Sequence, residues 1–334
     1  MSAIVATGYG APDVLQLTDV EKPVPKDNEL LVRVRATTVT AGDTRMRSFS
    51  VPSLLWLPAR MTLGFSKPRH IFGMELAGDV EAVGSAVQRF KVGDQVFAST
   101  LQHTFGGHAE YKCLPEDGAV AVKPRQLSYA EAATLAIGAH TALYFLRAGK
   151  IQPGQQVLIN GASGSVGTFA VQLARYFGAH VTGVCSTRNV ALVQSLGADQ
   201  VIDYTQVDWT SMGETYDIIF DAVGTTTFAH CNRALKPNGS YLHTGMVGAA
   251  IKGLWYRLTA GKHVIGGTAA PRREALDVLR ELSEAGRLKS VIDRSYPLDQ
   301  IADAHRYVDT GRKQGNVVIT VDQRNDRPPS PIHG

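Results

Sequence analysis

The first third of the chain is a series of short apolar runs separated by turn residues. ELLVRVRATTV, LAGDVEAVG and GDQVFAST are examples, with Gly, Asp and Pro between them up to about residue 123. Runs of this length and spacing are typical of antiparallel strands in a barrel-like domain. The pattern therefore predicts an all-β, barrel-type first domain.

From Ser128 onward the hydrophobic pattern changes to strand and helix periods in alternation. Amphipathic segments such as 168–177 and 189–196 separate apolar runs. The predicted strands are 156–160, 180–185, 200–204, 216–223, 240–245 and 263–267. Strands that alternate with helices build a parallel sheet with helices on both faces. We expect one doubly wound, six-stranded nucleotide-binding sheet.

The last part of the chain predicts a helix, RREALDVLRELSEAG, and a final strand, GNVVITV. That strand comes too late for the six-stranded sheet, so we expect it to return to the first domain. The tail from Asp322, DQRNDRPPSPIHG, has the polar, proline-rich composition of a disordered segment. The predicted organisation is a first domain over 1–123 and 270–322, a nucleotide-binding domain over 124–269, and a disordered tail over 323–334.

The composition adds little to this picture but excludes several classes. With 44% hydrophobic and 19% charged residues, the 334-residue chain is typical of a globular protein. The net charge of +4 comes from scattered Lys and Arg, so we expect no nucleic-acid partner. No stretch has the pattern of a signal peptide or of a membrane span, and three distant cysteines fit a reducing compartment. We expect a cytoplasmic protein without a membrane partner.

The sequence VLINGASGSVGTFAVQLAR, residues 157–175, is a candidate phosphate-binding turn. It joins an apolar strand to an amphipathic helix, where backbone N–H groups at the helix N-terminus bind a pyrophosphate. Gly164 would let the backbone approach the phosphates and Gly167 would let the helix pack on the strand, while Ala162 replaces the first glycine of the common pattern. The candidate turn comprises Ser163, Gly164, Ser165, Val166 and Gly167. Two readings of its serines are open, phosphate binding and helix capping.

The end of the second predicted strand decides which nucleotide is favoured. A carboxylate about 20 residues after the turn would accept the 2′-hydroxyl of NAD. This chain has Ser186 and Arg188 instead, and a hydroxyl and a guanidinium can hydrogen-bond a 2′-phosphate. We therefore predict NADP(H) as the cofactor. A solvated surface role for Arg188 is the other reading.

Eight motifs, in this order, resemble the medium-chain dehydrogenase/reductase superfamily and within it the zinc-free quinone oxidoreductase-like branch. They are EKPVPKDNELLVRVRAT, GMELAGDVEAVG, VGDQVFA, GGHAEYKCLPED, AATLAIGAHTAL, VLINGASGSVG, LGADQVIDYT and GNVVITV. The resemblance extends over nearly the whole chain. It implies an α/β protein: a GroES-like substrate domain of β-barrel type built from both ends of the chain, and a Rossmann domain with a doubly wound, parallel, six-stranded sheet.

The resemblance also identifies the positions at which zinc-bearing relatives hold their catalytic metal. Those positions carry Thr40, Met74 and, by a less direct alignment, Ile137. A hydroxyl, a thioether and an alkyl group do not form the Cys and His set that catalytic zinc requires. The four-cysteine lobe of those relatives is missing too, since Cys113 is the only cysteine between residues 96 and 115. We expect no metal, and we expect the histidines to lie in loops or on the surface.

The resemblance places Thr40 and Asp43 beside the nicotinamide, as tentative catalytic residues. Pairing with a neighbouring arginine, such as Arg45 or Arg47, is the other reading of Asp43. Thr141 in GAHTAL matches a threonine that packs on the nicotinamide, and a bond to a carbonyl of its own helix is the alternative.

The strand ends supply the remaining candidates. Tyr204 in VIDYT matches a tyrosine near the adenosine phosphate, with a purely structural role as the alternative. Relatives often carry a lysine where this chain has Asn189, and a tyrosine that protonates substrate where it has Phe49, so the proton donor is unassigned. Doubly wound sheets bind ligands at their carboxyl edge, which adds Val223, Gly224, Thr244, Gly245 and Met246.

Without zinc there is no Lewis acid to lower the pKa of an alcohol, so hydride transfer from NADPH to an electron-poor acceptor is favoured over alcohol oxidation. The resemblance and this chemistry predict an NADP-dependent, metal-independent oxidoreductase that reduces a small hydrophobic quinone or α,β-unsaturated carbonyl. We expect a homodimer. Two alternatives stay open, an enoyl-thioester reductase and a catalytically weak NADPH-binding scaffold. The apolar segment 48–70 lines the substrate cleft, covers a dimer surface or fills the core.

Overall fold

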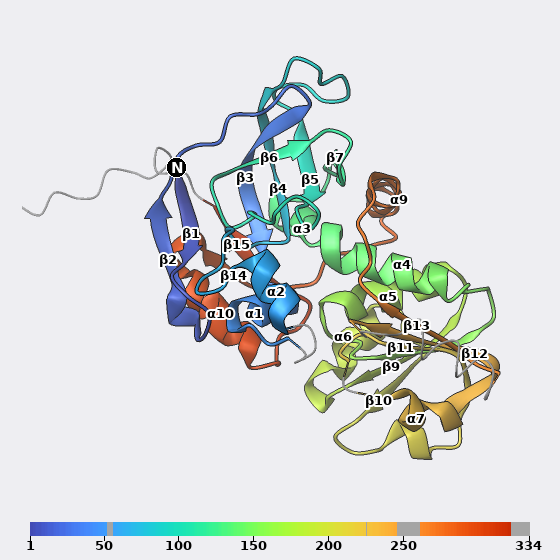
Figure 1. The fold of residues 1–334 in the computed structure, drawn as a ribbon. Coiled ribbons are helices and arrows are strands. Elements are labelled where there is room, and N and C mark those ends of the chain that lie inside the picture. The colour runs from blue at the N-terminus through green and yellow to red at the C-terminus, as the bar shows by residue number, and fades with distance from the viewer. Residues whose placement is uncertain (52–55, 225, 246–260, 322–334) are drawn as a thin grey trace, which may run out of the picture. The chain divides into compact units, whose positions relative to one another are not determined.

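The computed structural model describes residues 1–51, 56–224, 226–245 and 261–321. By its internal contacts the chain divides into two compact units (Figure 1). The first unit comprises Met1–Ile137, Pro271–Glu281 and Ile292–Gly334, and the second comprises Gly138–Ala270 and Leu282–Val291. The domain boundaries predicted from the sequence stay predictions, and the predicted tail over 323–334 lies outside the described residues.

Strands from both ends of the chain form the main sheet of the first unit. In the described part of this unit the strand order is β14-β15-β3-β4-β5-β7, with β6 paired to β3. The strands are β3 Glu29–Thr38, β4 Glu75–Val83, β5 Gln95–Ser99, β6 Tyr111–Pro115, β7 Val120–Val122, β14 Ile292–Pro297 and β15 Asn316–Thr320. Only β14 and β15 pair in parallel among these described strands. The predicted strand GNVVITV is β15, and its pairing with β3 joins the end of the chain to the first domain.

A hairpin and several short helices accompany this sheet. β1 Ser2–Ala6 pairs with β2 Leu15–Asp19, and the helices are α1 Ala41–Ser48, α2 Trp56–Leu63, α3 Tyr129–Ala133 and α10 Ile301–Asp309. Leu30, Val32 and Val34 of β3 are fully buried in one core cluster. Alternate side chains of a strand share one face, so this spacing directs the apolar side of β3 into the core.

The second unit is built on a parallel sheet. Among the described residues its six strands run in the order β10-β9-β8-β11-β12-β13. They are β8 Gln156–Asn160, β9 His180–Cys185, β10 Gln200–Asp203, β11 Tyr216–Asp221, β12 Leu235–Thr244 and β13 His263–Gly267. The strand order reverses between β8 and β11, which is the switch point of a doubly wound sheet. The predicted α/β fold class is confirmed.

The described helices of the second unit are α4 His140–Ala148, α5 Ser165–Tyr176, α6 Val190–Ser195 and α7 Phe228–Cys231, while α9 Arg273–Glu284 runs from the first unit into the second. A π-helical turn, Leu135–Ala139, precedes α4. Phe169 and Leu173 are buried on the apolar face of α5, as the helical period predicts.

Candidate functional site

The turn between β8 and α5 requires glycine at a position that the common motif does not mark. Gly161 has a φ of +77°, and a Cβ built on it would lie 2.0 Å from Cγ2 of Val223. Ala162 is fully buried and is not among the residues with positive φ. The chain accepts alanine at 162 because the left-handed position is one residue earlier.

Close packing of backbone on backbone fixes the start of α5. A Cβ at Gly167 would lie 2.0 Å from the carbonyl oxygen of Gly161. A Cβ at Gly183 in β9 would lie 2.5 Å from Cγ1 of Val193 and 3.1 Å from Cβ of Ala162. The turn, the helix and the neighbouring strand therefore leave no room for another methyl group. This is the packing predicted for Gly167.

The N-terminus of α5 presents its first amides without a side-chain cap. Its N-cap is Gly164, and no side chain of the described residues makes a cap hydrogen bond there. A Cβ on Gly164 would meet only the Gly161 carbonyl oxygen, at 3.4 Å, so the backbone is open to approach. Uncapped N–H groups at the positive end of a helix favour an anion. The arrangement fits a pyrophosphate beside Ser165 and Val166.

Asn189 joins the glycine turn to the end of β9. Its side-chain amide donates to Oγ of Ser163 at 2.9 Å and to Oγ of Ser186 at 3.2 Å. Asn189 is buried, whereas Arg188, its neighbour in the same short turn, is exposed. Asn189, which stands where relatives often have a lysine, thus brings together the hydroxyls of Ser163 and Ser186, both of which were predicted to bind phosphate. The sequence pointed to Asn189 only as a difference from relatives that often have a lysine there, and this contact was missed.

The residues around Tyr204 are tied together by one carboxylate. Asp203 accepts hydrogen bonds from Thr187 Oγ1 at 2.5 Å and from Thr205 Oγ1 at 2.7 Å. These bonds, led by that of Thr187, lower the pKa of Asp203. Tyr204 is 60% exposed, and its backbone N–H donates to the Cys185 carbonyl at 3.0 Å. Its ring therefore lies outside the core, at the carboxyl end of β10. An exposed ring in this place offers a stacking surface for a nucleotide base.

A buried carboxylate shapes the loop after β11. Asp221 is fully buried, and its two oxygens accept from the backbone N–H groups of Val223 at 3.2 Å, Gly224 at 2.9 Å and Thr226 at 3.0 Å. Asn160 Nδ2, at the end of β8, donates to the same carboxylate at 3.0 Å. Asp221 thereby links the ends of the two strands that flank the switch point. The sequence prediction named Val223 and Gly224 but missed the residue that holds them.

The other described candidates of the second unit lie in or next to β12 and at the start of α4. Thr244 ends β12, and the N–H of Gly245 donates to the Gly267 carbonyl at 3.0 Å. Thr141 is the second residue of α4, which packs against α5. Met246 lies outside the described residues. The structure thus brings the described candidates after β8, β9, β11 and β12 to the carboxyl ends of neighbouring parallel strands.

In the first unit, Thr40 and Asp43 form a reciprocal helix cap. Thr40 is the N-cap of α1: its Oγ1 donates to Asp43 Oδ2 at 2.6 Å and accepts from the Asp43 N–H at 3.1 Å. The other Asp43 oxygen accepts from the Gly73 N–H at 3.1 Å. Arg47, one suggested partner of Asp43, instead pairs with Asp309 at 2.7 Å. The cap fixes α1 against the segment that contains Met74.

Two of the three positions expected at a zinc site, Thr40 and Met74, are in contact with each other. Thr40 Oγ1 lies 3.6 Å from Sδ of Met74, and a Cβ on Gly42 would lie 2.6 Å from Cε of Met74. The motif comparison therefore selected residues that meet in space. A hydroxyl that already donates to Asp43 and a thioether do not fit a zinc ion, whose protein ligands are thiolate, imidazole and carboxylate.

Glu75 is a buried acid that sequence reasoning missed. Its oxygens accept from Thr38 Oγ1 at 2.5 Å and from the Ile137 N–H, in the π-helical turn, at 2.6 Å. Burial raises the pKa of Glu75 to about 8, against the effect of both hydrogen bonds, and the charge of Asp43 raises it further. The signal available in the sequence was an acid at the start of a strand, directly before the apolar residues Leu76 and Ala77.

Replacing Glu75 by Gln tests this buried acid. The native state holds the proton up to about pH 8, while the unfolded chain releases it near 4.5. The native state therefore binds more protons in this window, and stability falls as pH rises, by up to about 1.4 kcal/mol per unit. We expect the unfolding free energy of Glu75→Gln to lack this decline. Urea titrations of both proteins between these pH values give the difference, and parallel curves would contradict it.

Three histidines depart from the expected loop or surface positions. His108, His140 and His305 are buried, so that prediction is wrong for them. Burial lowers the pKa of His140 to about 4 and that of His305 to about 2, the latter with contributions from His108 and Arg47. The His140 and His305 rings are therefore neutral at pH 7, and all three histidines pack as core side chains. Across the described ranges, no three His, Cys, Asp or Glu side chains form a group able to hold a metal ion.

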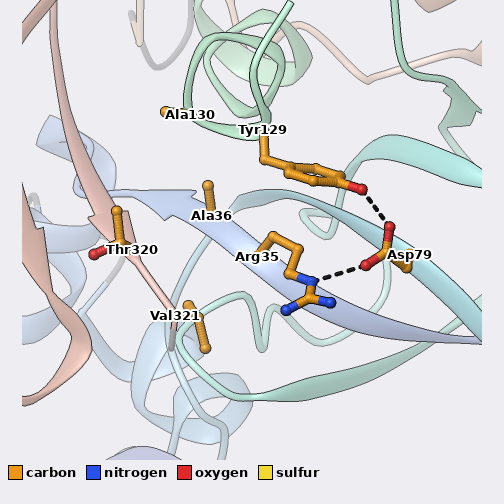
Figure 2. Close-up of a pocket in the computed structure, with 7 residues that line it drawn as sticks. All are labelled: Arg35, Ala36, Asp79, Tyr129, Ala130, Thr320 and Val321. Atoms are coloured by element: carbon orange, nitrogen blue, oxygen red, sulfur yellow. Dashed lines mark hydrogen bonds and ion pairs between the residues drawn. The ribbon is translucent and has the colours of Figure 1, made fainter. Parts of the chain in front are cut away.

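A separate pocket lies on the first unit, away from the predicted residues. Figure 2 shows the Tyr129 hydroxyl and the Arg35 guanidinium both directed at the carboxylate of Asp79, and Ala36, Ala130, Thr320 and Val321 complete the lining. Arg35 Nε pairs with Asp79 at 2.8 Å, and Tyr129 donates to the same side chain. Burial and the bond to Asp79 raise the pKa of Tyr129, so the phenol stays protonated. The polar groups here satisfy one another, which is typical of a structural cluster.

Comparisons with known proteins were made for the whole chain. Residues 26–124 match the family model of the alcohol dehydrogenase GroES-like domain, and residues 196–319 match that of zinc-binding dehydrogenase. The chain is 33% identical to a quinone-oxidoreductase homolog of Spinacia oleracea over 96% of its own length and 98% of the relative. It is 30% identical to the NADPH-dependent alkenal/one oxidoreductase of Arabidopsis thaliana, over 96% and 79%. The Escherichia coli quinone oxidoreductase complexed with NADPH has 26% identity and a TM-score of 0.82, with 96% and 100% covered.

Proposed function

The chain belongs to the medium-chain dehydrogenase/reductase superfamily, in its quinone oxidoreductase-like branch, and on this premise we propose that it is an NADPH-dependent, metal-independent reductase of quinones or α,β-unsaturated carbonyl compounds. The contact between Thr40 and Met74 carries the proposal, because it puts a hydroxyl and a thioether where a zinc-dependent enzyme needs thiolate and imidazole. Relatives named for quinones and for alkenals support the substrate class.

We propose that NADPH binds along the carboxyl ends of the strands of the second unit. The uncapped start of α5 and the glycine turn suit the pyrophosphate, and Ser186 with Arg188 suits the 2′-phosphate. Tyr204 offers an exposed ring near the same strand ends. The loop held by Asp221 and the backbone of Thr244 and Gly245 suit the ribose and carboxamide. NADPH supplies the hydride when it is bound.

We propose that the chain positions the acceptor and that solvent supplies the proton. The Thr40 hydroxyl donates to Asp43, so in this geometry it does not donate to a substrate. The Asp43 carboxylate accepts three hydrogen bonds from Thr40 and Gly73, which suits a structural anchor rather than an acid. An electron-poor acceptor needs only orientation and the exclusion of competing water for hydride transfer. Thr40 and Asp43 then act by holding the segment that carries Met74.

The test of this function is a parallel assay of three acceptor classes. The pure protein is mixed with NADPH and a benzoquinone, an enone or an enoyl thioester, and the loss of NADPH absorbance is followed. We expect turnover with the quinone or the enone, unchanged by a metal chelator. Turnover with the thioester alone would favour the enoyl reductase. Tight NADPH binding without any turnover would favour the scaffold function.

Replacing Arg188 by Ala tests the choice of nucleotide. We expect NADPH affinity to fall by about tenfold or more, since hydrogen bonds to a charged group contribute about 1.5–3 kcal/mol. NADH lacks the 2′-phosphate, so its affinity should change little. Arg233→Ala, at an exposed arginine of the same unit, is the matched control. Calorimetric titrations with both nucleotides measure the four changes, and equal losses for NADPH and NADH would remove Arg188 from the site.

We further propose that the protein acts in the cytoplasm and forms a homodimer. Its three cysteines are free in the structure, which suits a reducing compartment. Two-fold symmetry is the commonest form of a soluble oligomer. Light scattering at several concentrations tests the dimer, and cell fractionation tests the location.

A further inference from the structure

Helix α2 and the turn that follows it expose four large apolar side chains. Trp56 is 47% exposed, Leu57 55%, Met61 60% and Phe65 57%. We call these four residues the α2 patch. None of the residues of α2 is buried, although the helix is mainly apolar in composition. The sequence-based possibility that this segment fills the core is therefore wrong for the α2 patch.

The helix is nevertheless fixed to the first unit through Arg60, which also lies 5.3 Å from the centroid of the Trp56 ring. The guanidinium of Arg60 lies 3.9 Å from the ring centroid of Phe49 and 4.3 Å from that of Tyr9. The Tyr9 hydroxyl donates to the Gly64 carbonyl at 2.9 Å, just after the helix. Cation–π contacts of this kind stabilise a partly exposed cluster. The α2 patch is thus presented by an anchored helix.

The charged residues in the stretch of sequence that contains the α2 patch have one sign. The sequence contains no Asp or Glu between Asp43 and Glu75, a stretch that includes five Arg or Lys residues. Arg45, Lys67 and Arg69 of this stretch are exposed. Apolar side chains, a tryptophan and cations on one surface element are the combination that binds the interface of an anionic membrane.

We propose that the α2 patch docks the protein reversibly on an anionic lipid surface. Leu57, Met61 and Phe65 would enter the boundary between headgroups and acyl chains, and Lys67 and Arg69 would lie against the lipid phosphates. A second copy of the chain fits less well, because a two-fold interface would bring this basic segment against itself. None of the described helices is long and apolar enough to cross a bilayer. The proposal is of surface contact, and it departs from our sequence-based expectation of no membrane partner.

Vesicle binding tests the proposal without any measurement of catalysis. The full chain is sedimented with phosphatidylcholine vesicles that contain or lack phosphatidylserine. We expect binding to the anionic vesicles, weakened by added salt as surface charges are screened. Leu57→Asp with Met61→Asp should reduce that binding by about tenfold or more, because each carboxylate is repelled by the lipid phosphates. The matched control is Val92→Asp with Val207→Asp, at exposed valines 60% and 44% accessible elsewhere, which should bind as the wild type does.

A second readout follows Trp56 itself. Its emission should shift to shorter wavelength on anionic vesicles, and Trp56→Phe should remove that shift. Two results would overturn the proposal. The wild type would fail to bind anionic vesicles, or the control variant would lose as much vesicle binding as the double variant of the α2 patch. Conversion of a dimer to a monomer by the double variant, with vesicle binding retained, would assign the patch to a second copy. A raised KM for a water-soluble quinone, again with vesicle binding retained, would assign it to the substrate site.

Discussion

Replacing Gly161 by Ala is expected to lower NADPH affinity by about a hundredfold, or about 3 kcal/mol. The residue has a φ of +77°, which costs a non-glycine residue roughly 1–2 kcal/mol. The new Cβ would also lie 2.0 Å from Cγ2 of Val223. The backbone of Val223 cannot simply move away, because Asp221 accepts hydrogen bonds from the amides of Val223, Gly224 and Thr226. The turn must therefore open, and the amides at the start of α5 lose their alignment.

A matched variant separates backbone strain from this collision. Gly154 has a φ of +80°, and nothing lies within 4 Å of a Cβ built on it. Gly154→Ala should cost about 1 kcal/mol of stability and leave the NADPH dissociation constant unchanged. Urea unfolding and calorimetric titration measure the two effects. Equal NADPH affinity in Gly154→Ala and Gly161→Ala would contradict the assignment of the turn.

A second substitution tests the collision directly. Val223→Ala removes Cγ2, so in the Gly161→Ala background it should recover part of the lost affinity. Val223→Ala alone measures what the valine itself contributes to binding. A double-mutant cycle of these four proteins isolates the coupling between the two positions. Additive losses would show that Val223 does not oppose the new methyl group.

The periodic parts of the fold could be predicted from the sequence because their burial is set by local pattern. The apolar run of β8 and the amphipathic helix α5 each follow one period, and the six strands of the second unit were found in this way. The glycine turn was found too. Its strained residue was not, since the common motif draws attention to position 162 while the left-handed residue is Gly161.

Several contacts of the candidate site that were missed join residues distant in the sequence. Glu75 meets Ile137 across 62 positions, and Asn160 meets Asp221 across 61. No local period marks such a pair, because the fold alone brings its members together. Asp221 did carry a signal, as an acid directly at the carboxyl end of an apolar strand. Asn189 carried none, since its two hydroxyl partners lie on different loops.

The Thr40 and Met74 pair shows what resemblance adds to pattern. Periodicity gives no reason to compare positions 40 and 74, which lie on opposite sides of a long apolar segment. The comparison of motifs selected them, and the structure places their side chains 3.6 Å apart. Resemblance did not show that Thr40 also caps α1 through Asp43, which follows from the local T-x-x-D spacing and the physics of helix N-termini.

Replacing Asp221 by Asn is expected to cost about 3 kcal/mol or more of the unfolding free energy and to weaken NADPH binding with it. Asp221 accepts six hydrogen bonds from described residues, three at each oxygen. Asparagine has the same shape, but its NH₂ group would face the backbone N–H groups of Val223 and Gly224 in one orientation and that of Thr226 in the other. The substitution therefore removes hydrogen-bond acceptors at a fully buried position and creates no cavity.

The control for Asp221 is an exposed carboxylate with a similar local role. Asp208 accepts from the N–H and the hydroxyl of Thr210, and its side chain is 56% exposed. Asparagine is an equally good cap there, and water can hydrate the changed group, so Asp208→Asn should cost well under about 1 kcal/mol. Urea unfolding compares both variants with the wild type, and NADPH titration follows the loop. Similar stability of the two variants would mean that the Asp221 loop accommodates an NH₂ group, and the carboxylate would then not be what fixes Val223 against the glycine turn.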